Sequence, residues 1–276
     1  MKKHLSTIIL ILVFLTGLSL LLYPTVSDYW NSFHQSRAIA TYASEVAALD
    51  NDAYDELWEA AQAYNRRLAR RKDPLIQSGE DLAEYQSLLD ITGTGVMDYI
   101  EIPELNVSLP LYHGVDEGVL QIAVGHIPGT SLPTGGEGTH SVLSGHRGLP
   151  SAKLFTNLDQ LREGDLFLLR VLDETLTYEV DQILIVEPDQ LEALAIDPQQ
   201  DYCTLVTCTP YGINTHRLLV RGHRIENQAD AASIRVTADA MQIEPVIVAP
   251  VVAAPILLLL MLWVLLGGRG KRKRKL

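Results

Sequence analysis

Cys208 ends a strand-like stretch, Asp-Tyr-Cys-Thr-Leu-Val-Thr-Cys-Thr-Pro, that also contains Cys203. Residues five apart in a strand point to opposite faces and lie about 17 Å apart, which is far beyond the reach of a disulfide. The two thiols should therefore not pair. A free thiol is a buried inert side chain, an intermolecular disulfide partner or a nucleophile. Cys208, at the exposed end, is the better candidate nucleophile, whereas Cys203 is expected to pack in the core.

A thiol nucleophile needs a base or cation that favours the thiolate, and acyl transfer needs a donor for the oxyanion. His146 follows a strand-like run and has Gly145 and Gly148 nearby, which permits a sharp turn and leaves the imidazole exposed. Arg217 follows Cys208 by nine residues, a spacing that suits two adjacent antiparallel strands joined by a loop. Strand periodicity places Arg217 on the face opposite Leu218, towards a groove rather than the core.

Other residues compete for these roles, and the spacing alone leaves them open. Arg221 and Arg224 are alternatives to Arg217, although solvated strand charges are the more ordinary interpretation of both. No His/Cys pair has the close spacing of zinc ligands. A papain-like fold is disfavoured because His146 precedes Cys208 and the cysteine ends a strand. Five other histidines in the same region are each more typical of structural or surface positions: His113, His126, His140, His216 and His223.

The net charge of −12 is distributed very unevenly along the 276 residues. Eight basic residues lie in two terminal segments that contain no acid, residues 1–27 and 268–276. The remaining 14 basic and 34 acidic residues give the region between them a charge of −20. A region this acidic repels phosphate backbones, so nucleic acid is not expected as a partner.

Both ends of the chain are apolar. Residues 5–22 form an uncharged run of 18 residues and residues 246–266 one of 21. As helices they would rise roughly 27 and 31 Å, close to the thickness of a bilayer core. Basic residues flank the outer end of each run, which places both termini in the cytoplasm. We therefore expect an anchor or signal in residues 1–27, a transmembrane helix in 246–268, a basic tail in 269–276 and an extracellular domain between the two spans.

Between these ends the pattern changes from helical to strand-like near residue 96. Residues 28–72 have helical apolar spacing, interrupted at Asp50, which can cap a second helix and so form a helical hairpin. Residues 73–95 are expected to be a loop with at most one helical turn within 82–89, and residues 226–245 a linker. Residues 96–225 predict a mainly β fold, an antiparallel eight-stranded barrel with a short helix at 152–161. The expected strands are residues 99–102, 107–112, 120–124, 140–143, 165–172, 175–186, 202–208 and 216–224.

Two motifs resemble those of the sortases. Residues 204–217, Thr-Leu-Val-Thr-Cys-Thr-Pro-Tyr-Gly-Ile-Asn-Thr-His-Arg, are similar to the TLxTC signature and the following arginine strand, and residues 140–150 are similar to the histidine motif. The resemblance covers roughly residues 96–225 and implies an eight-stranded sortase barrel. It implies a transpeptidase in which Cys208 attacks the Thr–Gly bond of an LPxTG-type sorting signal, His146 is the acid/base and Arg217 positions the substrate or the oxyanion. No cofactor is expected for this chemistry.

Three features resemble the class C, pilin-polymerising sortases: the second apolar span, the helical extension, and Asp73-Pro74-Leu75, which resembles a lid motif in which an aromatic residue follows the proline. Here Leu75 replaces the aromatic residue, with less area to shield the thiol. The implied partners are the membrane, pilin or surface proteins that carry LPxTG-type signals, and a pilin lysine as acceptor. The alternatives are a sortase that uses a peptidoglycan-precursor amine, a membrane-tethered cysteine hydrolase and a non-enzymatic scaffold.

Overall fold

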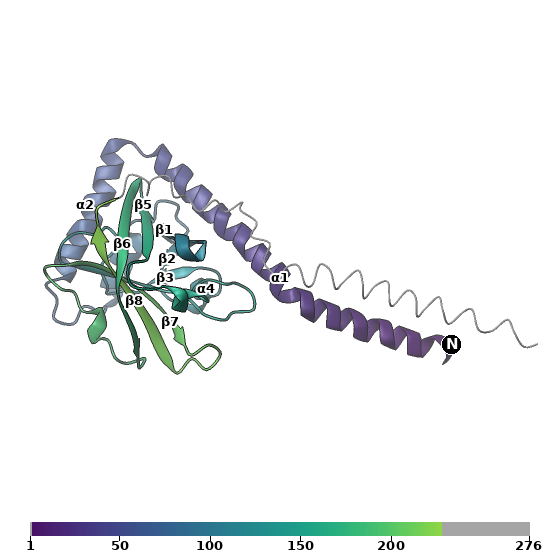
Figure 1. Cartoon of the computed structure of the whole chain (residues 1–276). Helices are drawn as coiled ribbons and strands as arrows, with labels where there is room; N and C mark the ends of the chain where they lie inside the picture. The colour runs from purple at the N-terminus through teal and green to yellow at the C-terminus, as the bar shows by residue number, and fades with distance from the viewer. Residues whose placement is uncertain (1, 228–276) are drawn as a thin grey trace, which may run out of the picture.

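The computed structural model describes residues 2–227 and shows a closed β-barrel from which one long helix projects (Figure 1). Eight strands close the barrel in the order β1-β2-β3-β4-β7-β8-β6-β5. The helices are α1 (Lys2–Ala48), α2 (Asn51–Leu68), α3 (Gly79–Ser87) and α4 (Glu117–Leu120), with 3-10 turns η1 (Pro103–Leu105), η2 (Leu158–Gln160) and η3 (Glu192–Leu194). The strands are β1 (Val96–Ile102), β2 (Val107–His113), β3 (Val124–His126), β4 (Thr139–Ser144), β5 (Leu166–Val171), β6 (Glu174–Val186), β7 (Asp201–Thr209) and β8 (His216–Ile225).

The eight-stranded barrel was predicted, but the expectation that it is antiparallel was wrong. β2 pairs with β3 in parallel, and β4 pairs with β7 in parallel. Parallel neighbours need a long crossover connection, and β5 and β6 lie between β4 and β7 in the chain. This crossover brings the carboxyl ends of β4 and β7 to the same end of the barrel.

Three local predictions also need correction. The third strand begins at Val124 rather than near residue 120, because residues 117–120 form α4. The expected helix at 152–161 is reduced to the short turn η2. The expected loop after residue 73 contains α3, whose first turn is capped by Ser78 and Asp81: each side chain accepts from the other residue's backbone N–H. This reciprocal capping satisfies two backbone donors at the helix start.

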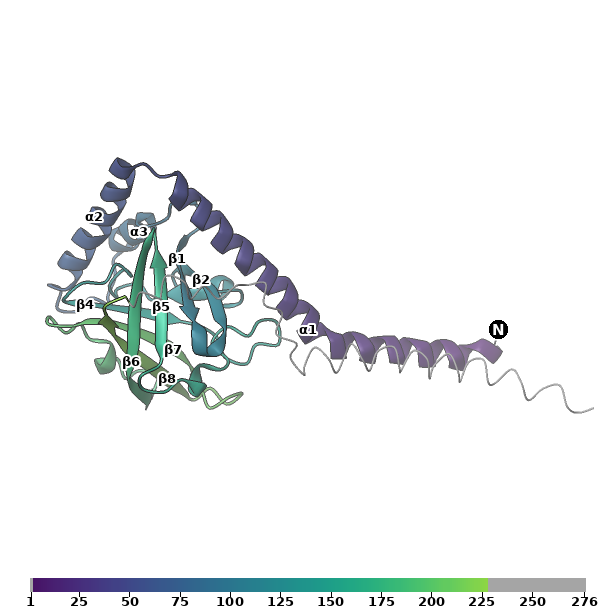
Figure 2. The same ribbon diagram turned by 45° about the horizontal axis from the view of Figure 1, so that its top comes forward.

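The N-terminal helices form the expected pair of elements joined at residues 49–50 (Figure 2). Asp50 caps α2 by accepting a hydrogen bond of 2.8 Å from the backbone N–H of Ala53. The apolar stripe of α2 is buried at Ala61, Tyr64 and Leu68. These side chains join the main hydrophobic core, which also fills the barrel.

α1 is the one helix within residues 2–227 that is long and apolar enough to cross a membrane. It continues past the apolar run, with Pro24 inside it, and its later turns contact β1 and β2. In Figures 1 and 2 its N-terminal part extends well beyond the barrel. This helix supports an N-terminal membrane anchor. The predicted second span, residues 246–268, and the basic tail lie outside the described residues.

A second, smaller apolar cluster lies on the outer face of the barrel. It consists of Val142 on β4, Val206 on β7 and Leu219 on β8, with partly buried neighbours that include Leu184 and Leu194. Successive strand residues point to opposite faces, so these three positions alternate with inward-facing core residues. The outer cluster therefore forms an apolar surface on the outside of β4, β7 and β8, and neighbouring residues such as Leu194 in η3 cover most of it.

Candidate active site

β7 separates the two cysteines as the strand periodicity predicts. Cys203 has no exposed surface and belongs to the main core. Cys208 is partly exposed and lies on the same strand face as Val206 of the outer cluster. Both thiols are free. Burial raises the pKa of the Cys203 thiol well above its usual value, and nearby Asp98 and Asp201 add to this shift. The accessible thiol at the strand end is therefore Cys208.

Arg217 lies directly opposite Cys208 in the antiparallel pairing of β7 with β8. Side chains in such directly opposed positions project from the same face, with Cβ atoms about 5 Å apart. Nη1 of Arg217 donates to the backbone carbonyls of Asn214 and His216, at 3.4 and 3.2 Å. These bonds involve one of its two terminal nitrogens, so other guanidinium N–H groups can bind an oxyanion next to the thiol.

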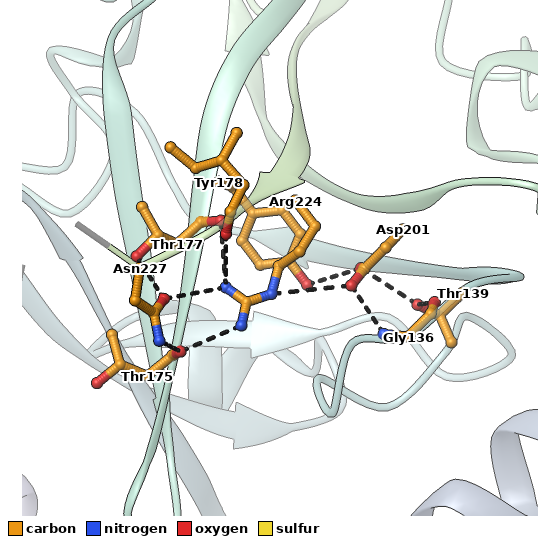
Figure 3. Close-up of polar contacts among 9 residues, drawn as sticks. Gly136, Thr139, Thr175, Thr177, Tyr178, Asp201, Arg224 and Asn227 are labelled. Carbon is orange, nitrogen blue, oxygen red and sulfur yellow. Dashed lines mark hydrogen bonds and ion pairs between the residues drawn. The ribbon is translucent and has the colours of Figure 1, made fainter.

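The two alternative arginines are bound elsewhere. Arg221 makes a bidentate ion pair with Asp181, with distances of 3.0 and 2.8 Å, and its guanidinium lies 4.1 Å from the ring centroid of Tyr202. Arg224 lies near the start of β7, where it approaches Asp201 at 3.9 Å (Figure 3). Both arginines thus stabilise the barrel wall, and Arg217 is the arginine beside the thiol.

His146 follows β4, whose carboxyl end lies beside the carboxyl end of β7. The parallel register pairs Ser144 with Val206, and the backbone N–H of Gly145 donates to the Val206 carbonyl at 3.0 Å. The hydroxyl of Thr207 then donates to the Gly145 carbonyl at 2.7 Å. The two chains therefore remain side by side as far as Gly145, which immediately precedes His146, while Val206 lies two residues before Cys208. Its side chain is half-buried.

Gly145 is required at this turn for steric reasons. A Cβ atom at this position would lie 2.7 Å from the ring of Phe155. That ring packs against the backbone immediately before His146, so a larger residue would displace the turn that presents the imidazole. The glycine frame noted in the sequence thus has a packing role as well as a conformational one.

Several other histidines are held in structural hydrogen bonds. His126 is fully buried, with Nδ1 3.0 Å from the Tyr85 hydroxyl and Nε2 2.8 Å from the Ser131 carbonyl. Its burial lowers its pKa to about 3 and keeps the ring neutral. His140 is also buried, with Nε2 2.7 Å from the hydroxyl of Thr204. Neither imidazole is accessible to a substrate.

The predicted lid residues, Asp73, Pro74 and Leu75, lie against the loop between β3 and β4. A Cβ atom at Gly129 would lie 2.5 Å from the Pro74 carbonyl oxygen and 2.8 Å from the Leu75 Cα. Only glycine allows this close approach. The segment and Leu194 both line a cavity of about 460 Å³. Leu194 also belongs to the outer cluster, so the cavity adjoins the apolar surface that leads to Cys208.

Arg147 is a site neighbour that the sequence analysis did not single out. Its Nη1 donates to the Thr209 hydroxyl at 3.3 Å, and its guanidinium lies 5.8 Å from the ring centroid of Tyr211. It also forms an ion pair with Asp159. These contacts connect the turn after β4 to the loop after β7. Its position next to His146 was the available signal, but a single arginine in a loop does not predict such contacts.

Comparisons with known proteins agree with this geometry. A model of the sortase domain matches residues 100–225. Sortase D of Bacillus subtilis is 30% identical over 129 residues, which is 46% of this chain and 62% of that protein, so the chain spans less than two thirds of this curated relative. The crystal structure of sortase C1 from Streptococcus agalactiae is 50% identical, with a TM-score of 0.68, and the match covers 70% of this chain and all of that one. Sortase C of Streptococcus pneumoniae is 44% identical, with a TM-score of 0.63, and the match covers 70% of this chain and 98% of that one. From its barrel topology and these matches, the chain belongs to the sortase family.

Proposed function

We propose that this protein is a class C sortase, a cysteine transpeptidase that polymerises pilin subunits. The observation that supports the proposal is the meeting of β4, β7 and β8 at one end of the barrel, where Cys208, Arg217 and the turn before His146 lie. Cys208 and Arg217 are directly opposed on β7 and β8, and the parallel register of β4 brings His146 to the same strand end. A nucleophile, a proton carrier and an oxyanion donor are the groups that acyl transfer requires.

The proposed reaction has two balanced steps. The Cys208 thiolate attacks the threonine carbonyl carbon of the sorting signal, and Arg217 donates hydrogen bonds to the oxygen that becomes negative. The C–N bond to glycine then breaks, His146 gives a proton to the departing amine, and a thioester remains. In the second step an acceptor amine attacks the thioester, His146 receives a proton, and the Cys208 sulfur leaves as the thiolate.

The pilin-polymerising assignment is supported by identities of 44–50% to sortases C1 and C. The structure of the S. pneumoniae relative gives insight into pilin substrate specificity. Another structural relative, 42% identical, is sortase C1 of a pilus island. The acceptor proposed here is accordingly a pilin lysine. Membrane anchoring through α1 would hold the site near membrane-held substrates and raise their effective concentration.

We further propose that residues 73–75 act as a lid over the apolar surface leading to Cys208. Pro74 and Leu75 are seated on Gly129, beside a cavity that shares Leu194 with that surface. Leu75 remains 36% exposed and Ile76 76% exposed, so this segment buries only part of its apolar area. A lid held by few buried contacts can open to admit a peptide and close to limit hydrolysis of the thioester.

The deciding experiment supplies the full-length chain in lipid nanodiscs with an LPxTG peptide and an amine. Pilin carrying its lysine, a wall-type amine and buffer alone are tested separately, and products are identified by mass. Lysine-linked product supports pilin polymerisation, wall-amine product supports surface anchoring, and hydrolysis alone supports a hydrolase. No cleavage in any arm would refute the enzymatic assignment.

Variants test the three roles. Cys208→Ala should abolish thioester formation, and His146→Gln and Arg217→Gln should each lower acylation by about 10²-fold or more. His216→Gln is a matched control, because this histidine adjoins Arg217 in β8 but occupies the opposite strand face. Full activity in His146→Gln would remove this residue from the mechanism.

A further inference from the structure

The loop that carries His146 is folded back on itself by backbone contacts. We call residues 146–157 the histidine loop. The backbone N–H of Phe155 donates to the His146 carbonyl at 3.1 Å, and the backbone N–H of Gly148 donates to the Thr156 hydroxyl at 3.1 Å. The backbone N–H of Thr156 in turn donates to the Lys153 carbonyl at 2.8 Å. The position of Lys153 is thereby linked to that of His146 through the loop backbone.

Two side chains of α1 bind the far side of this loop. Nδ2 of Asn31 donates to the Ser151 carbonyl at 2.8 Å, and Oδ1 of Asp28 accepts from the Lys153 backbone N–H at 3.0 Å. Nζ of Lys153 also lies 3.9 Å from the other carboxylate oxygen of Asp28. Residues three apart lie on one helix face, so the helix presents a matched acceptor and donor to one loop N–H and one loop carbonyl.

These contacts give the helix a part in the catalytic geometry. Asp28 follows the apolar run of residues 5–22 by only six residues, so the contact lies in the part of α1 just outside the proposed membrane. We propose that Asp28 and Asn31 are positioning residues for His146, and that the anchor helix is a structural part of the active site. This inference rests on the proposed acid/base role of His146. It identifies a specific contribution of α1 beyond tethering.

Docking of α1 onto the barrel is a different role from positioning His146, and Gln35 distinguishes these two roles. Gln35 lies one helical turn after Asn31 and is buried, and its Nε2 donates to the Ile122 carbonyl at 2.6 Å. Ile122 follows α4 and is not part of the histidine loop. Loss of the Gln35 bond should therefore loosen the docking of α1 without releasing His146.

The test measures acylation by the full-length chain in nanodiscs, with kcat and KM determined separately across pH. Asp28→Ala combined with Asn31→Ala should lower kcat by about tenfold, because a displaced His146 transfers its proton to the departing amine poorly, while KM changes little. Asn31→Asp and Asn31→Ala should lower kcat to the same extent, since aspartate keeps the shape of asparagine but loses the N–H donor. Asp28→Asn keeps an oxygen acceptor and should retain most of the activity. Gln35→Ala should lower thermal stability and leave kcat unchanged.

The outcomes separate this inference from the proposed function. Unchanged kcat in the Asp28/Asn31 double variant, with His146→Gln inactive, would overturn the positioning role and leave the mechanism in place. An equal loss of kcat in Gln35→Ala would also overturn it, because general docking would then explain the effect. Activity in His146→Gln would refute the role of His146 and the inference with it.

Discussion

Asp98 provides a sharp test of how the barrel interior is built. It lies on β1 with the same strand parity as Ile100 and Ile102, which belong to the core. Its side chain has no exposed surface, and neither carboxyl oxygen has a hydrogen-bond partner among residues 2–227. Burial raises the pKa of Asp98 well above its usual value. The carboxyl group is therefore protonated and neutral in the folded protein at pH values where the unfolded chain is ionised.

The sign of the pH dependence follows from this shift. Above the ordinary aspartate pKa of about 3.9, the unfolded chain releases the Asp98 proton and the folded chain retains it. Raising the pH therefore favours unfolding, by up to about 1.4 kcal/mol per pH unit, until the pH passes the folded-state pKa. Over three pH units this contribution reaches at most about 4 kcal/mol. Asp98→Asn has no proton to release and should lose this dependence.

The measurement is the free energy of unfolding of the barrel in urea, for the wild type and Asp98→Asn, between about pH 5 and 8. The unfolding free energy of Asp98→Asn minus that of the wild type should increase with pH. Asp189→Asn is the matched control because it removes an exposed carboxyl group. Parallel pH curves for the wild type and Asp98→Asn would refute the conclusion that Asp98 is neutral in the fold.

Three further predictions concern other residues. A maleimide should label one thiol in the folded chain, at Cys208, and reach buried Cys203 only on unfolding; two rapidly labelled thiols per folded chain would contradict this. Glu101→Gln removes the carboxylate that binds the largely buried guanidinium of Arg170 at 2.9 Å, and should lower the unfolding free energy in urea by about 3 kcal/mol. Gly129→Ala should displace the lid backbone seated on it and speed maleimide labelling of Cys208, and an unchanged labelling rate would exclude a lid at this position.

The best sequence predictions rested on local periodicity. The two-residue repeat of a strand was enough to put Cys203 and Cys208 on different strand faces. It also put Arg217 on the face that points away from the core, next to core-facing Leu218. Proline and glycine boundaries identified seven strands close to their observed limits. The third failed because Leu120 and its apolar neighbours also suit a short helical turn, and the actual strand, β3, has only three residues.

The helix α3 was predicted as at most one turn within residues 82–89, although the signal for a longer helix is present in the sequence. Ser78 and Asp81 have the spacing of a reciprocal cap, and both capping bonds form. Gly79 and Pro74 in the same segment favour a loop instead. The structural contribution of α3 is also non-local, since Tyr85 packs in the core and bonds His126, far away in the chain. Such a contact has no counterpart in the local pattern.

The placement of His146 depends on a feature that local patterns did not provide. In an antiparallel pairing of β4 with β7, the residues after Ser144 would run towards the start of β7, and His146 would lie far from Cys208. The observed pairing is parallel, with Ser144 opposite Val206. Both strands therefore end at the same end of the barrel. The residues after Ser144 continue towards the end of β7 that carries Cys208. The periodicity of β7 and β8 defines the Cys208–Arg217 pair, but only the crossover through β5 and β6 completes the proposed site with a base.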